Sequence, residues 1–250
     1  MSWVYLYGAS LPKTDFSKAN LADADLSCAQ LQNAIFSHAD LSRAKLKNAN
    51  MSDASLNKAT LIAANLSLAI MNKADLSSAI MNNVDLSEAK LDSAIFIKAV
   101  LSEGKLLEAD LTRAKLNYAN LDHASLIKAT LSGADLSSAI MNNVDLSEAK
   151  LDSATLDGAI LSDGKLLEAD LSGASLKKAK MFHASLNKAK LSRADLSSAI
   201  MNNVDLSEAK LDSATLDDAY LSDGNLSKAD LSGAVSKKLK CSMLPLTRQY

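Results

Sequence analysis

The chain has 250 residues, 48% of them hydrophobic, and its 27 basic and 29 acidic side chains leave a net charge of −2. This balance argues against direct nucleic-acid binding, which needs a surplus of basic residues, and no apolar stretch is long enough to span a bilayer. We therefore expect a protein-binding or structural protein rather than a nucleic-acid-binding or membrane-spanning one.

Residues 1–10, "MSWVYLYGAS", contain a short apolar run without a basic leader, which is not typical of a secretory signal. We predict that they start and cap the fold, and we expect a cytoplasmic protein. A translocated effector without a classical signal would show the same features.

A five-residue period begins next. Leu, Phe or Met occupies every position ending in 1 or 6 from Leu11 to Leu231. In an α-helix, a step of five residues turns about 140° past a full turn, so these side chains would cover all sides of the helix. In a straight strand, an odd period would send successive large side chains to opposite faces. We therefore expect a short extended piece that points the large residue i and residue i−2 inward, followed by a corner.

This unit resembles the pentapeptide-repeat family, whose repeat reads roughly Ala-(Asp/Asn)-Leu-X-X. The stretches "ADLSSA", "ANLADADLS" and "ADLSGASL" match it, and the resemblance extends from Ala9 to about Val235. The resemblance implies an all-β fold, namely a right-handed parallel β-helix of square, or quadrilateral, cross-section with four pentapeptides per coil. At about 4.8 Å per coil, about eleven coils would form one tube about 53 Å long, without loop insertions. The β-helix is predicted over residues 11–235.

A longer repeat is superposed on the short one. The string "ADLSSAIMNNVDLSEAKLDSA" begins at three places 60 residues apart, Ala74, Ala134 and Ala194. Sixty residues are three whole coils, so every copied residue returns to the same face of the tube. Such copying lengthens the tube without changing its register, and it is compatible with duplication or with design.

We number the four faces in chain order, starting with the unit of Leu11 as face one. On face four, Val replaces Ala at position i−2 in three coils, and Gly occupies the same position one coil later. A Val in an Ala-sized position overpacks the interior, and a Gly in the next layer supplies the missing room. The predicted core-compensation pairs are Val84 with Gly104, Val144 with Gly164, and Val204 with Gly224.

On face three, the residues at the outward position i−1 are unusually apolar. Two apolar residues occupy this position in adjacent coils, and such a pair occurs three times, at intervals of three coils, or about 14 Å. Asparagines at position i+1 border these pairs and can bond a partner. Exposed apolar groups with a polar rim mark contact sites, although β-branched residues also pack well along an exposed ladder without any partner. The candidate partner-binding residues are Ile80, Val100, Ile140, Ile160, Ile200, Tyr220, Asn82, Asn142 and Asn202.

Residues 236–250 leave the repeat. The end of a β-helix exposes unpaired backbone that templates association unless it is covered. We predict that this tail is either a cap or the contact of an end-to-end dimer, so that the protein is a monomer or such a dimer. The apolar residues available for either role are Leu239, Met243, Leu244 and Leu246.

Chemistry-bearing motifs are scarce. The chain has no Gly-rich phosphate loop, nucleophile elbow or zinc-ligand spacing. Most Asp residues stand at position i−1, where the repeat itself favours Asp or Asn. We therefore predict a protein that is not an enzyme, with no catalytic residues, no cofactor and no metal.

Three functions follow from this pattern. The first is a rigid scaffold whose outer faces bind protein partners. The second, implied by the quinolone-resistance branch of the family, is a DNA mimic that modulates or protects a type II topoisomerase. Duplex DNA carries one charge per about 1.7 Å, whereas this chain is almost neutral, which favours the first function. The third is an engineered or self-assembling repeat tube.

Overall fold

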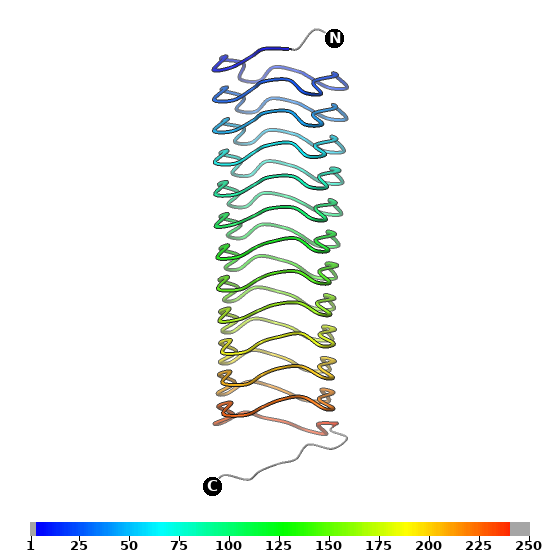
Figure 1. The fold of residues 1–250 in the computed structure, drawn as a ribbon, viewed down its shortest axis with the longest axis vertical. Coiled ribbons are helices and arrows are strands. Elements are labelled where there is room, and N and C mark those ends of the chain that lie inside the picture. Colours follow the sequence, from blue (N-terminus) through cyan, green and yellow to red (C-terminus); the bar gives the residue numbers. More distant parts are fainter. Residues whose placement is uncertain (1–3, 241–250) are drawn as a thin grey trace.

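The computed structural model describes residues 4–240, which form one straight column of stacked coils (Figure 1). No α-helix occurs among these residues. The chain instead repeats one bridging residue and two corner residues every five positions, from Tyr5 to Lys240. Bridging thus extends beyond the predicted β-helix bounds of 11 and 235, and the division into cap, helix and tail stays a prediction.

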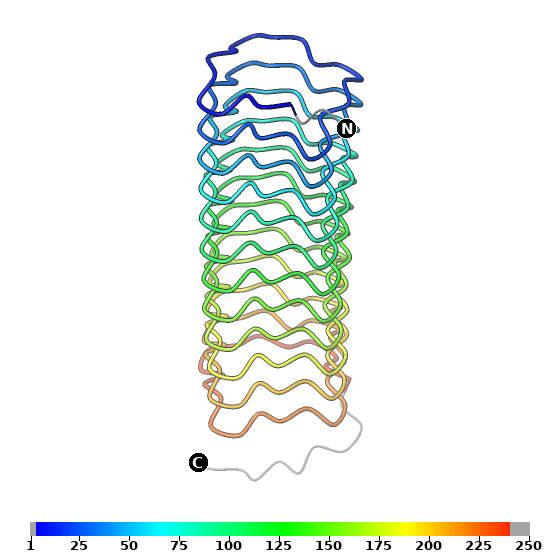
Figure 2. The same cartoon turned by 45° about the horizontal axis from the view of Figure 1, so that its top comes forward.

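The register of the coils is uniform. Each bridging residue pairs in parallel with the residue 20 positions later, as in Tyr5 with Asp25, Asp85 with Lys105, and Tyr220 with Lys240. Four five-residue units therefore make one coil, and Figure 2 shows the backbone of successive coils stacked into a closed column. Each bridge is a single residue, so the described chain has no longer strand.

Backbone hydrogen bonds between coils hold this register. The N–H of a central residue donates to the carbonyl of the next coil, as from Leu26 to Lys45 at 2.7 Å, and the N–H of Lys45 donates back to the carbonyl of Ala24 at 2.9 Å. Because unpaired backbone groups are costly when buried, this pairing is a condition for the closed interior. The sequence specifies it through the strict five-residue period.

The corners explain how the period is achieved. In nearly every corner the N–H of the next residue i−2 donates to the carbonyl of residue i, as from Ala19 to Phe16 at 3.0 Å. The intervening residue i+2 has a positive φ, 60° at Lys18 and 57° at Glu88. A positive φ at the third of four residues is the mark of a type II turn, which Gly and Asn adopt most easily. Here Lys, Glu, Ser and Asp adopt it as well, held by the coils above and below.

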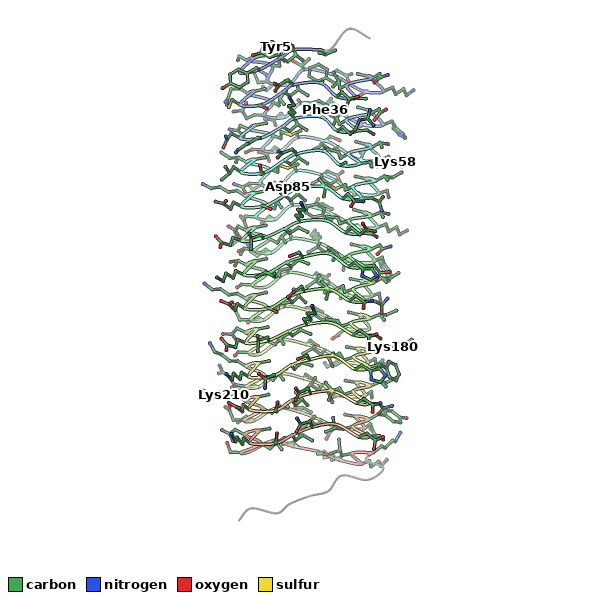
Figure 3. All side chains as sticks on the ribbon, in the orientation of Figure 1. Tyr5, Phe36, Lys58, Asp85, Lys180 and Lys210 are labelled. Atoms are coloured by element: carbon green, nitrogen blue, oxygen red, sulfur yellow. The ribbon has the colours of Figure 1, made fainter. Side chains whose placement is uncertain are left out.

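The interior consists of positions i and i−2. From Leu21 to Leu221 these side chains are almost completely buried, and no polar or charged side chain is buried anywhere in residues 4–240. Phe36 and Phe96 are the largest fully buried residues, and the ring of Phe16 stacks on that of Phe36 with centroids 5.0 Å apart. The polar side chains of the described residues therefore lie on the outside of the column (Figure 3), and these residues can contact other molecules only through the outer faces and the two ends.

Within residues 4–240 there is no helix with the length and apolarity needed to cross a bilayer.

Candidate partner-binding face

The six apolar residues predicted on face three form one ladder along the column. Parallel bridges join Ile80 to Val100, Ile140 to Ile160, and Ile200 to Tyr220. Between the pairs, the same column holds Asn120 and Lys180. Lys180 projects on this side of the column and Lys210 of face one on the opposite side (Figure 3). We call the six residues the apolar ladder: Ile80, Val100, Ile140, Ile160, Ile200 and Tyr220.

Accessibility differs within the apolar ladder. Ile80 is 42% exposed, Ile140 37% and Tyr220 38%, whereas Val100, Ile160 and Ile200 are half-buried. Each bridged pair thus contains one residue that is accessible and one that its neighbours partly cover. The ladder is therefore a row of three separate apolar patches with polar residues between them.

The asparagines beside the ladder are half-buried and are already used in part within the protein. The Asn142 side-chain amide donates to the carboxylate of Asp122 at 3.1 Å, and the Asn202 amide oxygen accepts from the backbone N–H of Ser222 at 3.3 Å. Asn82, Asn142 and Asn202 all lie in the predicted corner column. At least two of these amides therefore hold successive coils together.

Further apolar residues on face three were missed in the sequence because they occupy corner positions. Ile62, 40% exposed, and the half-buried Phe182 lie at position i+1 of the same face. Lys240 also contacts the last rung of the ladder, since its ammonium donates to the Tyr220 hydroxyl at 2.6 Å and lies 4.2 Å from the ring centroid. Arranging the sequence in rows of 20 residues would have revealed all three positions.

Asp residues at position i−1 are scaffold groups. The Asp145 carboxylate accepts hydrogen bonds from the backbone N–H of Ser147 at 3.0 Å and from its hydroxyl at 2.7 Å. In the same arrangement, hydrogen bonds from Ser27 lower the pKa of Asp25 below its ordinary value. A carboxylate that already accepts local hydrogen bonds stabilises the corner rather than acting as an acid or base.

Face four mixes acidic and basic side chains along the column. Asp85 bridges to Lys105, and the Lys128 ammonium lies 3.8 Å from the Glu148 carboxylate one coil away. About half of each of these two side chains is exposed, so such a pair contributes about 0–1 kcal/mol. Because basic residues interrupt the acidic ones, this face presents no continuous row of negative charge within residues 4–240.

The Val and Gly residues of the predicted core pairs lie in contact. A Cβ placed on Gly104 or Gly164 would be 3.5 Å from the Cγ1 of Val84 or Val144, and for Gly224 the distance to Val204 would be 3.3 Å. The closest atom at Gly104 and Gly164 is, however, the carbonyl oxygen of their own corner, at 2.8 and 3.0 Å. Compensation of the Val volume by Gly stays a prediction, and the corner backbone is a second reason for Gly.

Only Leu239 of the predicted cap or dimer contact lies within the described residues, where it packs partly buried against the core. Met243, Leu244 and Leu246 lie outside residues 4–240. The described chain contains no group of His, Cys, Asp and Glu side chains arranged to hold a metal ion.

Comparison with known families identifies the repeat. Eight stretches match the model described as pentapeptide repeats, at residues 1–37, 34–72, 69–106, 94–133, 105–143, 131–166, 166–197 and 199–235. The chain belongs to the pentapeptide repeat family. Pentapeptide repeat proteins fold as right-handed quadrilateral β-helices.

Solved structures of other pentapeptide repeat proteins are similar in sequence to different degrees. HetL, involved in heterocyst differentiation regulation in the cyanobacterium Nostoc, is 36% identical, with 82% of this chain and 87% of HetL covered and a TM-score of 0.32. The protein alr5209 of Nostoc is 34% identical over 51% of this chain and 84% of its own, with a TM-score of 0.21. Full-length QnrB1, a plasmid-mediated fluoroquinolone resistance protein, is 17% identical over 95% of this chain and 93% of its own, with a TM-score of 0.31.

These TM-scores are low, so the family assignment rests on the repeats and on the identity to HetL. No curated protein sequence matches the chain.

Proposed function

We propose that this pentapeptide repeat protein is a rigid, non-enzymatic scaffold that binds a protein partner through face three. The observation that carries the proposal is the apolar ladder, whose three accessible patches recur at equal steps along a straight column. Within residues 4–240, faces one, two and four carry isolated apolar residues, such as Ile35, Ile70 and Leu107, but no such series of bridged pairs. Regularly spaced apolar groups within a polar surround are the usual centre of a protein interface.

Rigidity supports this role. Hydrogen bonds link every coil to the next, so the patches keep fixed distances from one another. A partner then loses less conformational freedom than it would on a flexible surface, which favours binding. The scaffold therefore needs neither a pocket nor a bound cofactor to be specific.

The test is affinity capture with the triple variant Ile80→Asp, Ile140→Asp and Ile200→Asp. The matched control is Ile35→Asp, Ile70→Asp and Ile95→Asp, which places the same three charges at position i−1 on faces one and two. If face three is the contact surface, the wild type and the control recover the same partner and the triple variant does not. Equal recovery by all three proteins, or loss of fold in the triple variant alone by circular dichroism, would reject the proposal.

Topoisomerase modulation by DNA mimicry is the alternative. The mixture of acidic and basic residues on face four argues against it, because a DNA mimic needs a continuous series of anionic groups. A gyrase supercoiling assay decides between the two functions: inhibition or drug protection at micromolar protein would support mimicry, and no effect would remove it.

A further inference from the structure

The apolar ladder also indicates what kind of protein can cover it, and this step rests on the proposed use of face three as a contact surface. A partner must present apolar groups at steps of about 14 Å, which is three coils of a β-stack. An α-helix repeats every 5.4 Å and does not match this spacing. A second copy of this chain carries the same spacing on the same kind of surface.

We propose that two copies of the chain pack face three against face three in an antiparallel, two-fold symmetric dimer. In such an isologous interface, if residue i of the first copy contacts residue j of the second, then residue j of the first copy contacts residue i of the second. The ladder positions 80, 100, 140, 160, 200 and 220 are symmetric about the point midway between residues 140 and 160. Antiparallel packing about this point places Ile80 opposite Tyr220, Val100 opposite Ile200, and Ile140 opposite Ile160 of the second copy.

The polar positions of the ladder column fit the same register. Asn120 comes to lie opposite Lys180, so neither polar side chain faces an apolar one. Shifting the two-fold axis to the level of Asn120 would bring only two of the three apolar pairs together. Of these two registers, the one whose two-fold axis passes midway between residues 140 and 160 covers the whole ladder.

Charges at the corners distinguish the antiparallel arrangement from a parallel one. Face three is bordered by a leading corner (77–78, 97–98 and so on to 217–218) and a trailing corner (82–83, 102–103 and so on to 222–223). In a parallel dimer the leading corner of one copy meets the trailing corner of the other at the same height. Asp163 would then face Asp157, Asp223 would face Asp217, and Lys180 would face itself.

The antiparallel dimer removes these repulsions because each corner meets the same corner at the opposite height. The trailing corner then pairs every carboxylate at position i+2 with an asparagine, which can donate to it. The pairs are Glu103 with Asn203, Asp163 with Asn143, and Asp223 with Asn83.

The leading corner is complementary as well. Tyr118, 60% exposed, comes to lie opposite Lys178, where a cation–π contact is possible, and Lys98 lies opposite Ser198. The like-charged pair Lys58 and Lys238 falls one coil outside the ladder. Complementarity of charge and hydrogen bonding therefore selects the antiparallel dimer over the parallel one.

The interface is one face wide, so it belongs to the small class below about 1,200 Å² and the dimer is expected to depend on concentration. Sedimentation equilibrium over a concentration series tests it. The variant Ile80→Asp, Ile140→Asp and Ile200→Asp places one carboxylate in each apolar pair and is expected to raise the dissociation constant at least about tenfold. The control Ile35→Asp, Ile70→Asp and Ile95→Asp is expected to dimerise like the wild type.

Cysteine crosslinking tests the direction of packing in a background of Cys28→Ser and Cys241→Ser. Asn120→Cys and Lys180→Cys, made in separate chains and mixed, are expected to form a disulfide-linked dimer, and neither is expected to do so alone. Asp110→Cys mixed with Lys190→Cys is the control, since these residues occupy the same heights on face one. Crosslinking of Asn120→Cys with itself would show parallel packing and overturn the proposal.

The outcomes separate this inference from the proposed function. A chain that stays monomeric at all concentrations but recovers another protein through face three would overturn the dimer and leave the scaffold function standing. A dimer that survives the triple change uses another surface, such as the ends, and also overturns the inference. A monomer without any face-three partner would overturn both.

Discussion

The hexapeptide Ala-Asp-Leu-Ser-Gly-Ala occurs at residues 169–174, inside the column, and again at residues 229–234, near its end. Its local geometry is the same in both places, since the N–H of Ser172 donates to Asp170 at 3.1 Å and that of Ser232 to Asp230 at 2.9 Å. Its burial differs, because Leu171 is fully buried and Leu231 is 42% exposed. The hydrogen bond of the corner therefore forms even where the described residues provide a coil on one side only, whereas burial of the leucine needs coils on both sides.

The largest expected difference between the two regions concerns the leucine. Leu171→Ala is expected to cost about 2–5 kcal/mol of unfolding free energy, because a closed column leaves a cavity that cannot collapse. Leu231→Ala, at the exposed position, is expected to cost less than about 1 kcal/mol. Urea denaturation of the two variants measures both values, and equal losses would contradict the distinction between interior and end.

The second difference concerns the core glycines. Gly164→Val is expected to cost about 2–3 kcal/mol, because its Cβ would lie 3.0 Å from the Leu161 carbonyl oxygen, in backbone that neighbouring coils hold. At Gly224 the nearest atom is Leu221 Cδ1, also at 3.0 Å, and this side chain near the end can move, so Gly224→Val is expected to cost about 1 kcal/mol.

The double-mutant cycle of Val144→Ala with Gly164→Ala sharpens this result. Val144→Ala alone is expected to cost no more than about 1 kcal/mol, and it should reduce the cost of Gly164→Ala if the valine volume is the reason for glycine. Additive losses would instead assign the glycine to its own corner and reject compensation between coils.

The third prediction concerns the end itself. Deleting residues 236–250 removes Leu239 and the bridge of Lys240 to Tyr220. This deletion is expected to promote end-to-end association. It is also expected to lower the free energy of unfolding by about 1 kcal/mol. Deleting only residues 241–250 leaves both contacts in place. Light scattering compares the two truncations, and a larger complex from the shorter deletion alone would show that the described contacts do not protect the end.

The smallest expected effect is on the aspartates. Burial alone would raise the pKa of Asp170, but hydrogen bonds from Ser172 and the Lys190 ammonium outweigh it and hold this pKa below its ordinary value. Hydrogen bonds from Ser232 lower the pKa of Asp230. A carboxylate whose pKa is lowered in the folded state stabilises the protein at pH values above its unfolded-state pKa of about 3.9. This stabilisation disappears as the pH falls through the folded-state pKa.

Asp170→Asn is accordingly expected to lower stability at pH 7 by at most about 1 kcal/mol and to have no effect at strongly acidic pH. Asp230→Asn is expected to change less, since its carboxylate is exposed and lacks a lysine within ion-pair distance among the described contacts. Thermal melts across the pH range check this, and a pH-independent loss in Asp170→Asn would contradict an electrostatic origin.

Much of this protein follows from its period. The inward positions i and i−2 follow from the five-residue period, and the resemblance of the repeat unit implied both the family and the coil of 20 residues. Rows of 20 residues then place Ile80 above Val100 and Ile140 above Ile160 on one face, and the bridges confirm that register. Sequence could not give the exposure of each rung, because Ile80 and Val100 are both β-branched aliphatic residues, yet Ile80 is 42% exposed and Val100 is half-buried. It also could not show that Asn142 is already bonded to Asp122.

The sequence by itself thus determined the local corner, because a five-residue period permits no regular helix or straight strand and each Asp can bond the Ser two residues later. The four-unit coil was implied by the resemblance of this repeat to a known family. The tertiary structure decided which identical pentapeptides are core and which are surface, as Leu171 and Leu231 show. The physical reason is that a single coil cannot bury its own leucines: water is removed only where a coil lies between two others, and that depends on position in the stack rather than on the residues of the unit.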